Sequence, residues 1–273
     1  MNINERLSKG ILLLGCGKMG SAMLQGWLNE GFDPKRIWVI DPKPSNWLKS
    51  IGVNLNEDFP KTVNLALIAV KPQVIQEALP QLLSLTRGRV VFLSVAAGIP
   101  LKTYEDMLGV SSPIVRAMPN TPAAIGKGIS ALIGNNAATE ACIEICETLL
   151  SAIGQTVRLE SENQMDAVTG VSGSGPAYVF YMVDALAAAA RQQGLPEDLS
   201  MVLAKATVAG AGALALQSSE TPRQLRINVT SPNGTTQAGL EVLMNENSGL
   251  VPLISETVSR ATDRSRELSN ASN

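Results

Sequence analysis

The feature that most constrains the fold of this chain is a short apolar run, residues 10–14, that leads directly into GCGKMG at residues 15–20. A continuous apolar run of this length predicts a strand that is buried on both faces, as in a parallel sheet. The glycine-rich segment then opens a helical stretch that extends to about Glu30. A strand, a G-x-G-x-x-G loop and a helix in this order predict a dinucleotide-binding unit, which the motif alone would not.

Each glycine of the loop has its own expected role. Gly15 permits a tight turn, Gly17 lets the backbone approach a pyrophosphate, and Gly20 allows the helix to pack closely on the strand. The helix N-terminus adds free N–H groups and a positive dipole end. The plain alternative is a glycine-rich turn without a ligand, but its place between strand and helix favours cofactor binding. The candidate cofactor residues here are Gly15, Cys16, Gly17, Lys18, Met19 and Gly20.

The first half of the chain continues with alternating strand-like and helix-like segments. Further strands are expected at residues 37–40, 65–70, 90–95, 114–118, 129–133 and 155–159, with helices near residues 73–85 and 139–151. Strands that alternate with helices predict a doubly wound, mostly parallel α/β sheet of the Rossmann type. We place this domain at residues 1–160.

The second half has no convincing strand pattern and is expected to be all-α. Its helices are predicted at residues 176–193, 198–217, 222–228, 236–245 and 251–268. They are rich in alanine and glycine, which either reflects helix propensity or permits close packing of helix axes. A region of long helices has few ways to bury its faces alone. We therefore expect an all-α domain at residues 161–273 that packs against a second subunit.

Composition narrows the possible functions. A net charge of −2 without a basic block argues against nucleic-acid binding. The chain contains no histidine, which excludes a Ser-His-Asp triad and a histidine general base. The three cysteines are Cys16, Cys142 and Cys146, and without histidines they argue against a metal site.

The sequence also carries no pattern of a signal peptide or a membrane span. The N-terminal MNINERLSKG is polar, and the longest apolar candidate, residues 177–190, is short and is interrupted by Asp184. We therefore expect a cytoplasmic protein that does not enter a membrane.

Residues at the end of the second predicted strand are expected to determine whether NAD or NADP binds. Asp41 lies 21 positions after Gly20, near the spacing at which an acid binds the ribose of NAD. Lys43 follows at once and is suited to the 2′-phosphate of NADP, or is only a solvated loop charge. The sequence leaves the choice between NADPH and NADH open.

Two other predicted strands end in segments suited to a cofactor. Ligands in such folds bind at the carboxyl ends of the strands. AVKP follows the third strand, and the small residues of VAAGIP follow the fourth, where they leave room for a nicotinamide or ribose. The candidate cofactor residues in these segments are Ala69, Val70, Lys71, Pro72, Ala96, Ala97 and Gly98.

Three further segments carry a resemblance to a known family. They are RAMPNTPA at residues 116–123, GVSGSGPAYVF at residues 170–180 and LRINVTSPNGTTQAG at residues 225–239. Together with GCGKMG and AVKP, in this order, they resemble the pyrroline-5-carboxylate reductase family along essentially the whole chain. The two C-terminal segments are the most specific, since the other two motifs recur in many dehydrogenases.

The resemblance implies a Rossmann domain followed by a helical dimerisation domain, in a homodimer or a larger assembly of dimers. It implies hydride transfer from NADP(H), with NAD(H) as the alternative, to the cyclic imine 1-pyrroline-5-carboxylate, which yields L-proline. The family's pattern makes Thr236 the catalytic residue, placed to hydrogen-bond the ring nitrogen. It gives Asn56, or Asn54 as the alternative, an adenosine-side contact. The implied substrate-binding residues are Glu162, Asn228, Ser231, Gly234, Thr235 and Thr236.

The chemistry of SPNGTT, residues 231–236, agrees with that implication. A turn that feeds a helix presents successive backbone N–H groups, which suit a carboxylate, although the same residues would also serve as a plain helix cap. The family usually has two glycines after the proline, whereas the first of these positions is Asn233 here. Because asparagine tolerates a left-handed backbone, we expect the loop shape to survive.

Two alternatives remain open from the sequence. A β-hydroxyacid dehydrogenase or ketoacid reductase shares this architecture and typically uses a lysine, for which Lys71, Lys127 and Lys205 are the candidates. A non-catalytic nucleotide-sensing protein on the same fold is the other, because a fold does not by itself imply a function.

Overall fold

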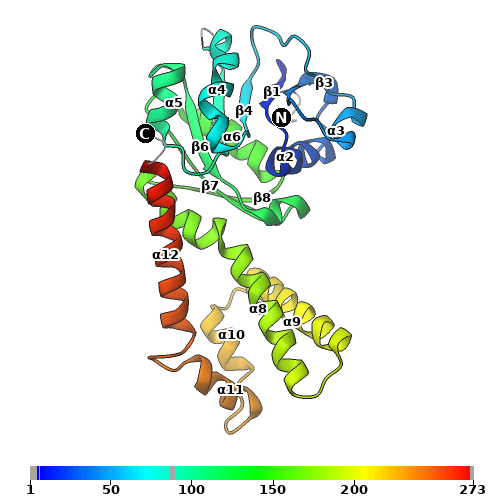
Figure 1. Cartoon of the computed structure of the whole chain (residues 1–273), viewed down its shortest axis with the longest axis vertical. Helices are drawn as coiled ribbons and strands as arrows, with labels where there is room; N and C mark the ends of the chain where they lie inside the picture. The colour runs from blue at the N-terminus through cyan, green and yellow to red at the C-terminus, as the bar shows by residue number, and fades with distance from the viewer. Residues whose placement is uncertain (1–4, 6, 87–89, 271–273) are drawn as a thin grey trace. The chain divides into compact units, whose positions relative to one another are not determined.

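The structure, a computed structural model, describes Glu5, residues 7–86 and residues 90–270 (Figure 1). It divides into two compact units. We call Met1–Gly173 with Ala261–Asn273 the first unit, and Ser174–Arg260 the second unit. The predicted domain boundary, after residue 160, lies before this division. Residues beyond that boundary bond to the sheet domain, as where the side chain of Asn120 donates to the carbonyl oxygen of Ser172 at 3.1 Å.

The first unit contains an eight-stranded sheet and short helices in its described part. The strands are β1 (Ile11–Leu14), β2 (Ile37–Ile40), β3 (Asn54–Leu55), β4 (Leu65–Ile68), β5 (Val91–Ser94), β6 (Ile114–Met118), β7 (Gly128–Gly134) and β8 (Gly154–Arg158). The α-helices are α2 (Lys18–Asn29), α3 (Asn46–Ser50), α4 (Ile75–Ala78), α5 (Leu101–Leu108), α6 (Glu140–Ser151) and α7 (Met165–Val168). The 3₁₀ helices are η1 (Pro34–Arg36), η2 (Pro72–Val74), η3 (Leu79–Leu85), η4 (Thr121–Ile125) and η5 (Glu162–Gln164), and η6 (Thr169–Gly173) is a π-helix.

The strand order is β3-β2-β1-β4-β5-β6-β7-β8. All neighbours are parallel except β6 and β7, which run antiparallel. The chain runs from β1 through β2 to the edge strand β3 and then returns to place β4 on the other side of β1, so the order reverses beside β1. This confirms the predicted doubly wound, mostly parallel sheet.

Alternate residues of the central strands bury into two different cores. In β1, Ile11 and Leu13 pack in a core with α2 and α6, whereas Leu12 and Leu14 pack in a second core with η3 and α5. Successive side chains of a strand point to opposite faces of the sheet. Helices therefore cover both faces (Figure 1), which explains why these strands read as continuous apolar runs.

The prediction of a single helix at residues 73–85 is wrong. The segment forms η2, α4 and η3 instead of one helix. Pro80 lies inside it, and a proline both lacks the N–H that a helix interior needs and collides with the preceding turn. The short elements β3, α3 and α5 were not predicted at all.

The second unit is helical throughout its described residues, as predicted. It contains α8 (Gly175–Gln192), α9 (Glu197–Gln217), α10 (Pro222–Asn228), α11 (Thr235–Leu243) and the first part of α12 (Leu250–Asn270). Its helices bury few side chains within the chain: Ala187 is the buried residue of α8, and Ser200 and Ala204 are those of α9.

Helix α9 bears on the expectation about membrane-spanning segments. Among the described residues it is one helix long and apolar enough, by length and composition alone, to cross a bilayer. No continuous apolar run marks it in the sequence, because Ser200, Lys205 and Thr207 interrupt its apolar residues. Apolar helices that pack against protein pass the same test.

Candidate cofactor and substrate sites

The glycine loop has the backbone geometry that its sequence predicts. Gly15 has φ of +86°, and a Cβ there would lie 2.8 Å from Val70 Cγ1. A Cβ at Gly20 would lie 3.0 Å from the carbonyl oxygen of Gly15, so the helix passes very close to the strand end. Gly17 differs, because nothing lies within 4 Å of a Cβ built on it. Gly17 therefore borders open space, where a pyrophosphate fits.

The N-terminus of α2 faces the same space without a side-chain cap. Gly17 is the N-cap residue, and no side chain bonds to the first turn. The N–H groups of the first turn of a helix lack partners inside the helix. Lys18 and Met19 contribute such groups, so this helix end can bind phosphate oxygens.

Cys16 stabilises the glycine loop through its buried side chain and its backbone hydrogen bonds. Its side chain is buried, and its carbonyl oxygen accepts a hydrogen bond from Ser21 Oγ at 3.0 Å. Burial raises the pKa of the Cys16 thiol, which disfavours a reactive thiolate. Its backbone N–H donates to Asp41 Oδ2 at 2.8 Å, so that N–H is already engaged.

Asp41, Lys43 and Asn56 meet beside this loop. The N–H of Lys43 donates to Asp41 Oδ1 at 2.7 Å, while the Lys43 side chain is exposed. Asn56 Oδ1 accepts from the N–H of Asp41, and Asn56 Nδ2 donates to its carbonyl oxygen, both at 2.9 Å. The structure thus brings together the three residues that the sequence singled out for the adenosine end of a cofactor.

The ends of β4 and β5 complete this edge of the sheet. Because β1, β4 and β5 are parallel neighbours, the segments after them share one edge. Ala69 and Val70 are half-buried, Pro72 starts η2, and the Lys71 side chain is exposed. The next segment runs through buried Ala96, exposed Ala97 and half-buried Gly98, which has φ of +74°. A Cβ at Gly98 would lie 3.7 Å from Leu268 Cβ, so the end of α12 packs beside it.

A buried polar group that the sequence analysis missed supports these segments. Ser94 Oγ and Tyr104 Oη are 2.5 Å apart, and Ser94 Oγ accepts the N–H of Ala96 at 3.2 Å. Burial raises the pKa of the Tyr104 hydroxyl well above its usual range, so it stays protonated. Ser94 and Tyr104 were detectable only as polar residues among apolar neighbours, a weak signal.

Glu162 joins the same region through Arg116, which was also missed. Glu162 Oε1 accepts from Arg116 Nη1 at 2.7 Å and from the backbone N–H of Leu101 at 2.8 Å. The Arg116 side chain is 6% exposed and that of Glu162 is 29% exposed. The carboxylate therefore neutralises a buried guanidinium and caps the start of α5, with one edge open to solvent.

The second unit holds the remaining predicted substrate residues. Ser231 to Gly234 form a turn in which the Gly234 N–H donates to the Ser231 carbonyl oxygen at 3.0 Å. Asn233 has φ of +58°, which a turn of type II requires at this position after a proline. This confirms that asparagine supports the loop shape. Gly234 is the N-cap of α11, and no side chain caps that helix.

Some polar groups in and beside this loop already have hydrogen-bond partners, whereas others are exposed. The Asn233 N–H donates to Gln237 Oε1 at 2.8 Å. Thr235 and Thr236 occupy the first turn of α11 with exposed side chains. Both ends of the Asn228 side-chain amide already have partners, because Nδ2 donates to Glu220 Oε2, just before α10, at 2.9 Å and Oδ1 accepts from Gln224 Nε2 within α10 at 2.8 Å.

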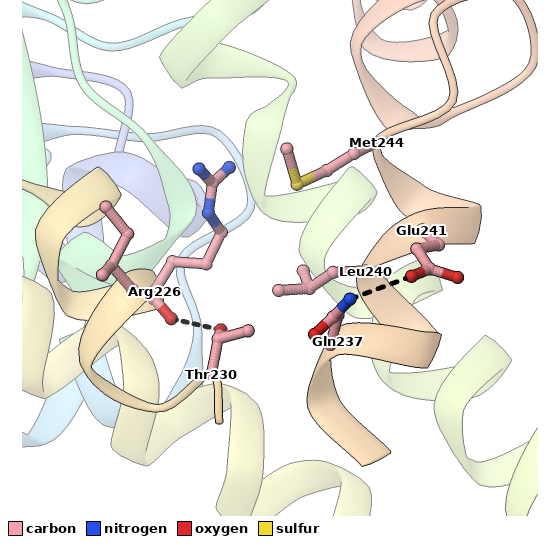
Figure 2. A pocket seen from close by; sticks show the side chains of 7 residues that line it. Arg226, Thr230, Gln237, Leu240, Glu241 and Met244 are labelled. Carbon is pink, nitrogen blue, oxygen red and sulfur yellow. Dashed lines mark hydrogen bonds between the residues drawn. The ribbon is translucent and has the colours of Figure 1, made fainter. Parts of the chain in front are cut away.

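A groove lies between α10 and α11 next to this loop. Figure 2 shows Arg226 and Thr230 on one side of it and Gln237, Leu240 and Glu241 on the other, with Thr230 Oγ1 donating to the Arg226 carbonyl oxygen at 2.6 Å. Gln237 lines the groove and accepts a hydrogen bond from the loop at Asn233. The candidate substrate residues 228–236 thus lie in the second unit, whereas the candidate cofactor residues lie in the first.

Comparison with known proteins shows the family to which the chain belongs. Residues 162–268 match the model of pyrroline-5-carboxylate reductase dimerisation, and residues 10–98 match that of NADP oxidoreductase, coenzyme F420-dependent. The pyrroline-5-carboxylate reductase of Pseudomonas aeruginosa is 35% identical over 264 residues, which cover 94% of this chain and 96% of that protein.

Solved structures agree. The structure of a pyrroline-5-carboxylate reductase from Coxiella burnetii matches with a TM-score of 0.90 and 33% identity, covering 96% of this chain and 98% of that one. Plasmodium falciparum pyrroline carboxylate reductase with NADP bound matches with a TM-score of 0.80 and 25% identity, covering 95% and 98%. This chain therefore belongs to the pyrroline-5-carboxylate reductase family.

Proposed function

We propose that this chain reduces 1-pyrroline-5-carboxylate to L-proline with NADPH, and with NADH as a second donor. The observation that carries the proposal is the likeness to reductases named for this substrate over 94% of the chain. That likeness favours this reaction over the hydroxyacid dehydrogenase and nucleotide-sensing alternatives.

The cofactor fits the first unit. The open space over Gly17, the uncapped start of α2 and the shared edge of β1, β4 and β5 form a cradle for a dinucleotide. A bound NADPH supplies the hydride for the imine carbon, and the imine nitrogen keeps or gains a proton as the C=N bond becomes CH–NH. The role of the protein is to hold the cofactor and the substrate close together in the orientation that hydride transfer requires.

The substrate fits the loop at residues 231–236. The first-turn N–H groups of α11 can bind a carboxylate, and the Ser231 and Thr236 hydroxyls add donors. Thr236 is proposed to orient the ring nitrogen. A protonated imine is already electrophilic and needs no strong acid, which agrees with a chain that contains no histidine.

We further propose that the chain acts as a homodimer or a larger homo-oligomer in the cytoplasm. The helices of the second unit leave many large apolar side chains exposed, which a second copy would cover: Phe180, Tyr181, Val202, Leu214, Leu216, Val242 and Val251. This proposal also gives the apolar helix α9 a protein partner in place of a bilayer.

The experiment is to mix the purified chain with 1-pyrroline-5-carboxylate and follow nicotinamide absorbance with NADPH and NADH in parallel. Oxidation of the cofactor with formation of proline is expected. Thr236→Ala should lower kcat by about a hundredfold if the hydroxyl orients the reacting nitrogen. Thr236→Ser keeps the hydroxyl and should recover most of that loss.

Two outcomes would count against the proposal. Near-native turnover by Thr236→Ala would remove this residue from the mechanism. If folded, cofactor-bound protein fails to oxidise either cofactor with the imine, the substrate assignment is wrong, and hydroxyacids should be tested next.

A further inference from the structure

Asp41 occupies the position at which an acid commonly accepts the ribose hydroxyls of NAD in a Rossmann fold. In this chain both oxygens of its carboxylate already accept backbone N–H groups, Oδ2 from Cys16 at 2.8 Å and Oδ1 from Lys43 at 2.7 Å. Such bonds hold the carboxylate against the loop, and two amide dipoles partly compensate its charge. Repulsion of a 2′-phosphate is weakened accordingly.

Asn56 fixes the backbone of the same residue. Its side-chain amide bonds both the N–H and the carbonyl oxygen of Asp41 at 2.9 Å. Asn56 itself has φ of +54°, and its N–H donates to the Val39 carbonyl oxygen at 2.8 Å. The Asn56 side-chain amide thereby adds two hydrogen bonds beyond the backbone pairing of β2 with β3. Asp41 is held at its side chain and at its backbone, and it has little freedom to turn toward a ligand.

Lys43 is in the opposite situation. Only its backbone N–H takes part in the contact with Asp41, and its side chain is exposed. It lies between Pro42 and Pro44, which restrict the backbone on both sides of it. An exposed ammonium is thus carried by a conformationally restricted segment that is joined to the glycine loop through Asp41.

We propose that Lys43 determines a preference for the 2′-phosphorylated cofactor, and that Asp41 is a positioning residue that shapes the phosphate loop without selecting between NADPH and NADH. This inference rests on the proposed function, because it takes the loop to bind a nicotinamide dinucleotide.

The test compares cofactors by two readouts in the full chain. Calorimetry gives the Kd of NADP⁺ and of NAD⁺, and steady-state assays with 1-pyrroline-5-carboxylate give the KM of NADPH and of NADH. Lys43→Ala is expected to weaken binding of the phosphorylated cofactor by about tenfold, as for the loss of one hydrogen bond to a charged group. Its affinity for NAD⁺ should not change. Lys49→Ala, at an exposed lysine of α3, is the matched control and should leave both affinities unchanged.

Asp41→Asn is expected to weaken the binding of both cofactors by the same factor. Asn56→Gly keeps the left-handed backbone but removes the amide, and it should act in the same way. If Asp41→Asn shifts the ratio of affinities toward the phosphorylated cofactor while Lys43→Ala leaves that ratio unchanged, the inference is wrong.

Failure of the proposed reaction is distinguishable from failure of the inference. If the wild type binds NADP⁺ but does not turn over the imine, the reaction is wrong and the calorimetric ratios still decide the roles of Lys43 and Asp41. If it binds neither dinucleotide, both proposals are overturned.

Discussion

The two units of this chain use apolar residues in opposite ways. In the first unit every residue of β1, β4 and β5 is buried, with helices on both faces of the sheet. In the second unit the buried residues of the long helix α9 are Ser200 and Ala204, and most of its apolar side chains face outward. The first unit closes its core within one chain. The second has helices in place but needs another surface, and the match to a dimerisation family agrees with a second copy.

The largest expected effect is in the core of the first unit. Trp27 is 0% exposed, and its indole N–H donates to the Leu149 carbonyl oxygen at 2.9 Å. Trp27→Ala is expected to lower the free energy of unfolding by about 4 kcal/mol, from lost burial and a residual cavity. Trp47→Ala removes a half-buried tryptophan of α3 and should cost clearly less. Denaturant unfolding measures both, and equal losses would contradict a core centred on Trp27.

The next effect tests the second unit. Val202 of α9 is 63% exposed in the chain alone. If a second copy covers it, Val202→Glu should raise the dimer dissociation constant by about a hundredfold, since a charge would be buried in an apolar interface. Sedimentation velocity over a range of concentrations measures this constant. Val110, 70% exposed in the first unit, is the matched control, and Val110→Glu should leave the mass unchanged. If the wild type stays monomeric at every concentration, no second copy covers Val202 and the proposed difference between the two units is wrong.

A smaller effect is expected at the ion pair of Glu162 and Arg116. Glu162→Gln keeps an acceptor for Leu101 but leaves the buried guanidinium without its counter-charge. We expect a loss of about 2 kcal/mol in stability, less than for complete removal of a partner from a buried pair. Exposed Glu160 is the control, and Glu160→Gln should be near neutral. If the two variants are equally stable in denaturant, the pair does not support the fold.

The smallest effect concerns a surface pair, and it depends on pH. Arg158 forms two bonds with Glu147, at 2.7 and 2.6 Å, and holds the pKa of that carboxyl below its ordinary value of 4.5. A carboxyl with a lowered folded-state pKa stabilises the fold above that ordinary value, and the contribution is lost as the pH falls through the folded-state pKa. Arg158→Gln should therefore lower the thermal stability slightly at neutral pH, because solvent screens an exposed pair.

The pH series supplies the control for that prediction. The difference between wild type and Arg158→Gln should shrink as the pH is lowered below 4.5 and vanish once both partners of Arg158, Glu147 and Glu140, are protonated. Arg260→Gln breaks a more exposed pair with Glu256 in α12 and should change stability little at any pH. Thermal unfolding across the range measures both variants. A difference for Arg158→Gln that grows toward acid pH would show that the sign is wrong.

Much of the first unit could be predicted because its strands are short apolar runs buried on two faces. The strands at Ile37–Ile40 and Ile114–Met118 have the predicted bounds. The antiparallel direction of β7 was not predicted, although residues 119–127 are too few for a parallel crossover, which needs about a dozen. The strand β3, with two residues, is too short to leave a periodic signal.

The candidate sites also contain some features that could be predicted from the sequence and others that could not. The glycine loop was predictable because its backbone conformation depends on local residue types, as Gly15 and Gly17 show. Contacts between side chains far apart in sequence were not, because they depend on packing and on rotamers. The bond between Arg116 and Glu162 joins residues 46 positions apart, and that between Cys16 and Asp41 joins residues 25 apart. For this reason the sequence located Asp41 but did not indicate that its carboxylate turns inward.

The turn at Asn233 has a consequence for how the protein ages. An asparagine followed by glycine is prone to deamidation, in which the glycine nitrogen attacks the side-chain amide, ammonia leaves, and hydrolysis of the ring produces a carboxylate. Here the N–H of Gly234 is held by the Ser231 carbonyl oxygen at 3.0 Å, so the folded loop restrains the attacking nitrogen. Loss of the turn would release that restraint. The new negative charge would then lie in the loop proposed to bind a carboxylate, so deamidation at this one residue would repel the substrate.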